Sequence, residues 1–355
     1  MSLTERLDAF QRRHRWAGFP LGVIYKFVDD QGPYLAALIT YYGFLSIFPL
    51  LLLLISVLGF VFENRPDLQE QFLNSALSQF PVIGEQLEQP QGLQGSVIAI
   101  AVGGLIALYG ALGVAQAIQN ASYVTWAVPR HRRPNPFRAR LRSLGLVAVF
   151  GLGVIVTTIL STFGSNAEAF GTSVRGRTTL GAVVVSIVVN WAVFLAMFRI
   201  FRPTQVRRRD IVPGALVAAV IWQLLQWYGA GIVGNAVQRA GESYGGFALV
   251  LGLLAWIYVA ALGVVFGSEI NVVRAKRLYP RALLTPFTDN VNLTDADVRA
   301  YDDAVSAQKF KGFQSVTVAY ENDGQHATAR QARTAAEAAS PATEAPEVPP
   351  EPSPE

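Results

Sequence analysis

Residues 180–201 read LGAVVVSIVVNWAVFLAMFRIF and contain no charged residue before Arg199. A helix needs about 20 apolar residues to cross the roughly 30 Å hydrocarbon core of a bilayer. A continuous apolar run without alternation favours a helix, because backbone groups within lipid must pair internally. Five further windows have the same character, at residues 35–62, 95–122, 143–163, 211–234 and 247–272. The sequence therefore predicts an all-α polytopic membrane protein, a bundle of six transmembrane helices.

The composition also indicates a membrane protein. Of the 355 residues, 52% are hydrophobic and 15% are charged, against about 25% charged residues in a soluble domain. The chain has no cysteine, which excludes disulfides, thiol catalysis and thiolate metal sites. Its three histidines, His14, His131 and His326, lie far apart in the sequence and outside the apolar runs. We predict no metal, cofactor or catalytic site, and we expect no cleavable signal peptide.

The segments between the windows alternate in their content of arginine and lysine. The cation-rich segments are residues 1–34, 130–142, 199–209 and 274–281, and the cation-poor segments are residues 63–88, 164–179 and 235–246. The positive-inside rule places the cation-rich segments in the cytoplasm. We therefore expect a multi-pass protein of the plasma (inner) membrane with both termini on the cytoplasmic side.

Three regions follow from this division. Residues 1–34 are expected to be a cytoplasmic amphipathic segment, residues 35–280 the six-helix transmembrane domain, and residues 281–355 a largely disordered cytoplasmic tail. In Leu3–Ala17 the apolar residues share one helical face, which favours a basic helix lying on the inner leaflet; a solvated, frayed terminus is the alternative. The tail ends in TEAPEVPPEPSPE, a composition that cannot bury enough apolar area to fold.

Polar residues inside the apolar windows are the candidate functional positions, because such residues are costly in lipid. One layer is expected near the cytoplasmic boundary, around the single acidic residue of the windows; it comprises Glu269, Gln116, Gln119, Asn120, Tyr41 and Tyr42. A second layer is expected near the midplane, with Ser46, Asn190, Gln223 and Gln226. The layers could hold helices together by hydrogen bonds, or line a cytoplasm-facing cavity in which Glu269 responds to protons or cations. Glu269 could instead pair with a loop arginine.

Two further features concern helix shape and packing. Pro49 lies in the middle of the first window, where proline removes a backbone donor and predicts a kink. Gly263 and Gly267 form a small-xxx-small pair that favours close helix packing over ligand binding.

The arginine-rich loops are expected to set the topology and to contact anionic lipid head groups, each cation contributing about 1 kcal/mol near the surface. We predict no nucleic-acid binding, because the loops are short and lack the interleaved aromatic residues on which single strands stack. Membrane lipids are therefore the expected partners, and homo-oligomerisation stays open.

Three stretches resemble the YihY/BrkB family of bacterial inner-membrane proteins, once labelled ribonuclease BN-like. They are AALITYYGFLSIFPLLLLL at residues 36–54, LYGALGVAQAIQNASYVTW at residues 108–126, and SYGGFALVLGLLAWIYVAALGVVFGSEIN at residues 243–271. The resemblance spans about residues 20–280 and implies a six-helix bundle in the plasma membrane. Its signature positions here are Tyr41, Tyr42, Ser46, Pro49, Asn120, Tyr244, Gly245, Trp256, Gly267, Glu269 and Asn271.

The resemblance does not supply an activity, and the ribonuclease label finds no His/Asp/Glu cluster that could hold catalytic metals. The polar layers, the Pro49 kink and the lack of a catalytic set favour transport or flipping of an amphipathic or lipid-linked envelope substrate. The alternative is a non-transporting scaffold that binds an envelope partner protein. An enzyme acting on RNA or lipid is the least supported class.

A reporter that is active only outside the cytoplasm tests the predicted orientation. Fused near Gln79, between the first two windows, it should be active, because this cation-poor loop is expected outside. An inactive reporter at this position would contradict the topology.

Overall fold

The computed structural model describes residues 3–61, 97–165, 175–203, 206–226, 228, 246–288 and 291–320. All regular elements in these residues are helices, which confirms the all-α class. The chain forms two compact units, Met1–Gly312 and Phe313–Glu355. Every helix described below belongs to the first unit; in the second, residues 313–320 form neither helix nor strand.

Five helices have 27 to 31 residues: α3 (Gly32–Val61), α6 (Val97–Thr125), α7 (Pro136–Ser165), α8 (Arg175–Phe201) and α10 (Gly246–Lys276). At 1.5 Å per residue each is about 40 Å or longer, more than the thickness of a hydrocarbon core. Residues 212–226 are also helical. In each of the six apolar windows the described residues are helical. The helix α3 runs without interruption through Pro49, whose side-chain surroundings lie outside the described residues.

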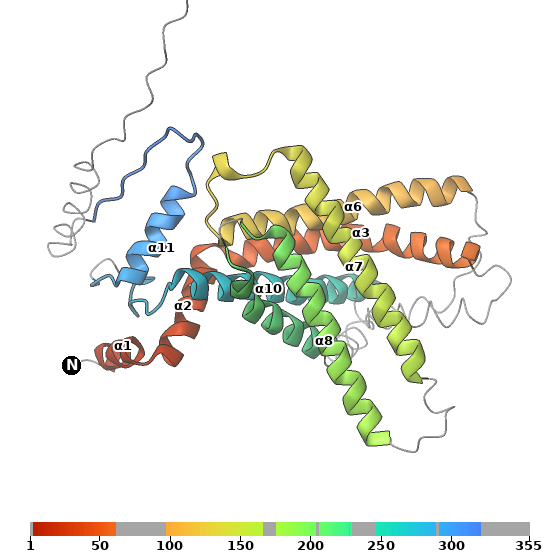
Figure 1. Cartoon of the computed structure of the whole chain (residues 1–355), viewed down its shortest axis with the longest axis horizontal. Helices are drawn as coiled ribbons and strands as arrows, with labels where there is room; N and C mark the ends of the chain where they lie inside the picture. Colours follow the sequence, from red (N-terminus) through yellow and green to blue (C-terminus); the bar gives the residue numbers. More distant parts are fainter. Residues whose placement is uncertain are drawn as a thin grey trace, which may run out of the picture. The chain divides into compact units, whose positions relative to one another are not determined.

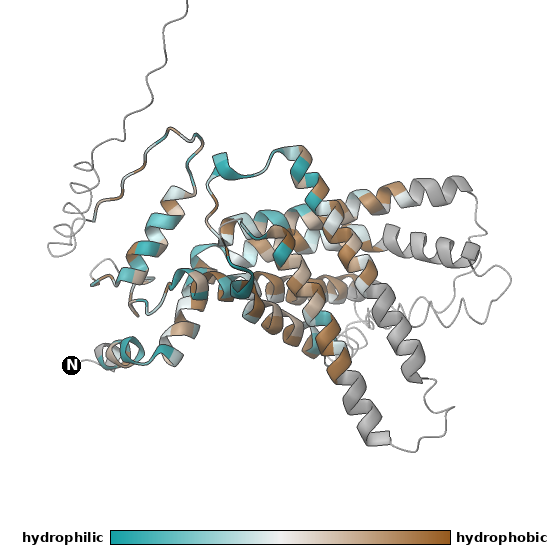
Figure 2. Ribbon diagram, in the orientation of Figure 1, coloured by the Kyte–Doolittle hydropathy of each residue, from teal (hydrophilic) through white to brown (hydrophobic). Residues whose placement is uncertain are grey.

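Two segments of the described residues are long and apolar enough to cross a membrane, Val184–Phe201 in α8 and Val250–Lys276 in α10. They support a membrane protein. Figure 2 shows that the described central parts of the long helices are largely apolar. The total of six crossings and the side on which the termini lie remain predictions.

The helices α3, α6 and α10 run side by side (Figure 1). Glycines bring α3 and α6 close together: a Cβ added to Gly110 would lie 2.7 Å from the Cβ of Ser46, and one added to Gly113 would lie 2.5 Å from the Tyr42 ring. Because the later residue of α6 meets the earlier residue of α3, the two helices are antiparallel. Small residues at such contacts let helix backbones approach closely.

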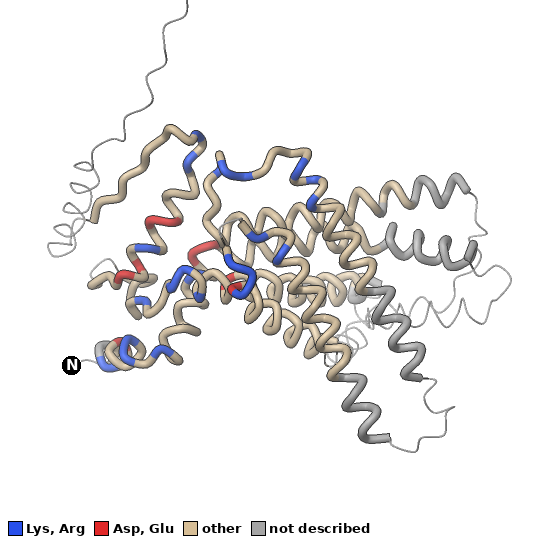
Figure 3. Tube along the Cα trace, viewed as in Figure 1, with Lys and Arg blue, Asp and Glu red and all other residues tan. Residues whose placement is uncertain are grey.

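The helix ends that face the arginine-rich loops meet at one end of the bundle, here called the basic end. At this end the Ser122 hydroxyl donates to the Phe201 carbonyl oxygen (3.2 Å), joining α6 to α8. The Thr125 and Ser268 hydroxyls lie 2.7 Å apart and join α6 to α10. The short helices η1 (Arg130–Arg132) and η3 (Arg208–Ile211) lie in the adjacent loops. Figure 3 shows that the charged residues of the described chain gather here.

Three shorter helices complete the first unit: α1 (Leu3–Arg13), α2 (Arg15–Asp29) and α11 (Asp295–Ser306). The amphipathic helix expected over Leu3–Ala17 corresponds to α1 and the first residues of α2; its position relative to a membrane remains a prediction. The helix α11 lies within residues 281–355, which were expected to form a largely disordered tail, and its residues Ala296, Asp297 and Ala300 are buried. This helix begins with a capping box, in which the Thr294 hydroxyl accepts from the Asp297 amide (3.2 Å) and the Asp297 carboxylate accepts from the Thr294 amide (2.9 Å).

Arg281, just after α10, ties these short helices together and has 1% of its surface exposed. Its Nε donates to Asp297 of α11, and both terminal nitrogens donate to Asp29 Oδ2 at 3.1 Å. The Arg281 carbonyl oxygen accepts from the Gln11 amide of α1 (2.5 Å). The hydroxyl of Tyr25 donates to the Leu283 carbonyl oxygen (2.5 Å). One guanidinium thus connects α2 and α11 to the end of α10.

Replacing Asp297 tests this connection. Asp297→Ala should lower the free energy of unfolding by about 3–5 kcal/mol, because it leaves the buried guanidinium without its buried partner. Asp295→Ala, in the exposed first turn of the same helix, removes a carboxylate of the same type and should cost much less. Thermal unfolding of the detergent-purified variants measures the difference. Equal losses would show that Asp297 contributes no more than a surface charge.

Candidate functional site

A buried cation lies in the last turn of α2. Lys26 is 3% exposed. Its ammonium group forms an ion pair with Asp30, donates to the Thr125 carbonyl oxygen (3.2 Å) and lies 3.9 Å from Glu269 Oε2. Lys26, Asp30 and Glu269, here called the charged triad, therefore join α2 and its end to α6 and α10.

The sequence of α2 explains how Lys26 reaches this position. Its buried residues, Gly18, Gly22, Val23, Tyr25 and Lys26, recur at helical spacing. A Cβ on Gly22 would lie 2.9 Å from the Leu278 carbonyl oxygen, and one on Gly18 would lie 3.2 Å from the Pro280 Cβ. The two glycines thus let α2 lie directly against the chain that leaves α10, which brings its last turn next to Glu269.

Glu269 is completely buried, with 0% exposure. Its carboxyl group is in hydrogen-bonding contact with the carboxyl group of Asp30. Lys26 and Asp30 are its main charged neighbours. A buried charge is costly, so an ionised Glu269 depends on the Lys26 ammonium group, 3.9 Å away, for compensation.

The two members of the triad outside the long helices have shifted pKa values. Burial disfavours the charged form of Lys26, but the carboxyl groups of Glu269 and Asp30 outweigh it, and the pKa of Lys26 is raised. Burial also raises the pKa of Asp30 above the ordinary range of an aspartate, against the opposing effect of Lys26. The ammonium is therefore held in its charged form, whereas Asp30 takes up a proton more readily than an exposed aspartate.

Asn271, two residues beyond Glu269, has a structural contact. Its side-chain oxygen accepts from the Gly214 amide (2.8 Å). Gly214 lies in the first turn of the helix at residues 212–226, where amides have no partner within the helix. Asn271 therefore caps this helix from α10 and fixes the register of the two helices.

The residues predicted for the cytoplasmic layer differ in their burial. Gln119 is buried, and Asn120 and Tyr42 are half-buried. Tyr41 is 60% exposed and Gln116 is also exposed, so both point to the outside of the described bundle. The structure does not bring these two residues to the triad.

The predicted midplane layer consists of separate contacts. The Ser46 hydroxyl donates to the Gly43 carbonyl oxygen within its own helix (2.9 Å). The Asn190 amide lies 3.5 Å from the Gln223 oxygen, a weak hydrogen bond between α8 and residues 212–226. Trp256 is buried edge-on against Trp222, with ring centroids 5.3 Å apart. Tyr244 and Gly245 lie outside the described residues.

Sequence reasoning missed Lys26 and Asp30. The available signal was a single cation in the apolar stretch PLGVIYKFV, residues 20–28, followed four residues later by a carboxylate. A lone lysine among apolar residues predicts a buried partner, but the identity of that partner is not encoded locally.

Comparisons with known proteins agree with a membrane protein. The family described as virulence factor BrkB matches residues 23–289. An uncharacterized protein of Dickeya dadantii is 26% identical over 255 residues, 66% of this chain and 76% of the relative. A UPF0761 membrane protein of Psychrobacter is 25% identical over 292 residues, 79% of this chain and 53% of the relative. The ribonuclease-like protein YfkH of Bacillus subtilis is 23% identical over 263 residues, 71% of this chain and 93% of the relative. No solved structure matches the chain.

A glycine substitution tests the contact that positions Asn271. A Cβ on Gly214 would lie 1.9 Å from the Gly267 carbonyl oxygen, so Gly214→Ala should force the helices apart and lower the unfolding temperature or prevent folding. Gly145→Ala is the matched control, because a Cβ there meets nothing within 4 Å and alanine favours a helix by up to about 1 kcal/mol. Thermal unfolding in detergent should separate the two variants. A Gly214→Ala protein as stable as the control would contradict this packing.

Proposed function

Because the chain belongs to the virulence factor BrkB family of membrane proteins, we propose that it transports or flips an amphipathic or lipid-linked substrate of the cell envelope. In this proposal six helices cross the plasma membrane and the basic end faces the cytoplasm. The observation that carries the proposal is the charged triad, which places two carboxyl groups and one ammonium group inside a helical bundle. Glu269 lies in a segment long and apolar enough to cross a membrane, where ionisable groups are costly and usually serve ion or substrate movement.

The charge balance of the triad suggests how it would act. With all three groups ionised the triad carries a net charge of −1; with one proton on the two carboxyl groups it is neutral. Gaining or losing that proton would change the attraction that holds Lys26, and with it α2, against α10. A bistable contact of this kind could couple a proton or cation to the opening of the bundle.

A non-transporting scaffold is the second candidate, and a different observation favours it. Gly214 and Gly267 pack α10 against residues 212–226 so closely that no side chain fits between them, and Asn271 fixes their register. Packing of this type supports a rigid bundle, which would present its loops to an envelope partner protein.

We do not propose a ribonuclease. The word ribonuclease-like belongs to the name of a relative that is 23% identical. Within the described part of this chain, no group of three or more His, Asp or Glu residues could hold a metal ion, and no other catalytic arrangement supports cleavage of RNA.

Neutralising Glu269 tests the proposed function. Purified protein in liposomes should move fluorescent phospholipids between leaflets. Glu269→Gln should reduce this flux by about tenfold or more, since an ionic contact of about 1.4 kcal/mol corresponds to a factor of ten. Lys26→Met should have a similar effect, because it removes the other half of the same contact. Asp295→Asn, on the exposed start of α11, is the matched control and should retain full flux.

Two outcomes would contradict the proposal. Full flux in Glu269→Gln would remove the triad from the mechanism. Absence of flux for every amphiphile tested with the unaltered protein would exclude transport of those substrates, and recovery of a stoichiometric partner by crosslinking in cells would then support the scaffold.

A further inference from the structure

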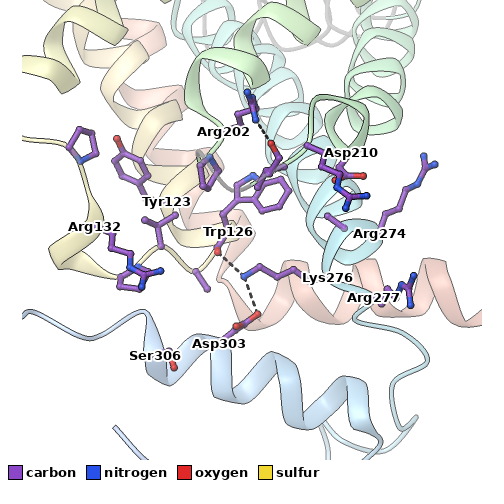
Figure 4. Close-up of a pocket in the computed structure, with 18 of the residues that line it drawn as sticks. Tyr123, Trp126, Arg132, Arg202, Asp210, Arg274, Lys276, Arg277, Asp303 and Ser306 are labelled. Atoms are coloured by element: carbon purple, nitrogen blue, oxygen red, sulfur yellow. Dashed lines mark hydrogen bonds and ion pairs between the residues drawn. The ribbon is translucent and has the colours of Figure 1, made fainter. Parts of the chain in front are cut away.

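A pocket of about 1020 Å³ opens at the basic end of the bundle (Figure 4). Its walls come from the end of α6 and the chain after it, the start of α7, residues 202–203 and 206–210, the end of α10 and one face of α11. The volume is at the upper limit of ordinary small-molecule sites, about 300–1000 Å³. Neither Glu269 nor any other member of the triad lines it, so the pocket is separate from the candidate site above.

The lining of the pocket is strongly basic. It contains nine arginine and lysine residues and two carboxylates, Asp210 and Asp303. Representative cations from three separate segments are Arg138 and Arg142, Arg207 and Arg209, and Arg274 and Lys276. Lys276 is paired with Asp303 of α11 (3.0 Å). The eight arginines have no carboxylate partner within the part of the chain that the structure describes, and Arg202 donates instead to the Val206 carbonyl oxygen.

So many unpaired guanidinium groups in one concavity repel one another, and an anion in the pocket would relieve this repulsion. Guanidinium groups match phosphate oxygens with two parallel hydrogen bonds. Beside the cations, the wall includes the apolar residues Val128, Pro203 and Val206. The pocket therefore combines charge for an anionic head with apolar surface for the group attached to it.

We propose that this pocket is a binding site for a phosphate-bearing group. Asp303 occupies part of it in the absence of that group, through its contact with Lys276, and a bound phosphate displaces the carboxylate. The proposal goes beyond the transport function, because binding requires neither flux nor the triad.

Two sources could supply the phosphate, an anionic lipid head group or a soluble phosphorylated compound. RNA is a different class of ligand and is disfavoured by the shape of the site. A strand needs an open track with exposed aromatic platforms. The two aromatic residues of this pocket are Trp126, which is buried, and Tyr123, whose ring is covered by the Arg133 guanidinium group.

The test removes one exposed arginine from each of the three segments, in Arg138→Gln/Arg207→Gln/Arg274→Gln. The matched control, Arg6→Gln/Arg13→Gln/Arg15→Gln, removes the same charge from exposed positions of α1 and α2 outside the pocket. A third variant, Asp303→Asn, removes the competing carboxylate. All are full-length proteins in a neutral detergent, and size-exclusion chromatography checks that they fold.

Binding is measured by titration with two probes, short-chain phosphatidic acid for the lipid source and inorganic pyrophosphate for the soluble source. The pocket variant should bind its probe about tenfold or more weakly, as expected from several cations of about 1 kcal/mol each. The control should bind within about twofold of the unaltered protein, and Asp303→Asn should bind more tightly. Phosphatidic acid alone as a ligand would identify a lipid head group, and pyrophosphate alone a soluble compound; either supports the site.

Equal weakening in the pocket variant and the control would overturn the proposal, since it would show diffuse attraction to a basic surface. Binding of neither probe, or of a single-stranded RNA oligonucleotide in their place, would also overturn it. The binding experiment does not measure flux. If Glu269→Gln loses transport but still binds the probe, the phosphate site is supported. If neither probe binds but Glu269→Gln still reduces flux, the transport proposal is unaffected.

Discussion

The ammonium group of Lys26 lies where α2, α6 and α10 meet, and the surrounding structure depends on compensating its charge. Neither lipid nor a packed protein interior can solvate an ammonium ion, so its partners must come from the chain itself. The carbonyl oxygen of Thr125, the Asp30 carboxylate and Glu269 supply them. These contacts of Lys26 hold α2 against α10. The neighbouring residue Asp29 accepts from Arg281, which holds the segment after α10 against α2.

Hydropathy predicted the long helices well, because a run of about 20 apolar residues has few alternatives in lipid. The described residues of all six windows are helical. The same signal cannot find α11, which is polar and held by ion pairs and a capping box. The residues of that box were visible as Thr294 and Asp297, three positions apart. These two residues alone did not predict a helix packed on the bundle, because the ion pair of Asp297 with Arg281 is visible only in the structure.

The candidate site was predictable only in part, for a related reason. Glu269 was conspicuous because it is the lone acidic residue of an apolar window. Which helix faces it could not be read, since uniformly apolar helices such as α3 and α6 have no amphipathic stripe to orient them. Tyr41 and Gln116, which were predicted to lie near Glu269, are exposed in the structure. The charged partner of Glu269 is Lys26, which had been assigned to the N-terminal segment outside the bundle.

The triad and the basic pocket are joined by the end of α6. The Thr125 carbonyl oxygen accepts from Lys26 inside the bundle (3.2 Å), and the next carbonyl, of Trp126, accepts from Lys276 at the pocket (2.8 Å). Helix ends leave such oxygens without partners in the helix and concentrate negative potential there. Each of these two oxygens therefore finds its partner in a lysine from another helix. The pocket and the triad are thus neighbours on the same helix end, although each site is held by its own contacts.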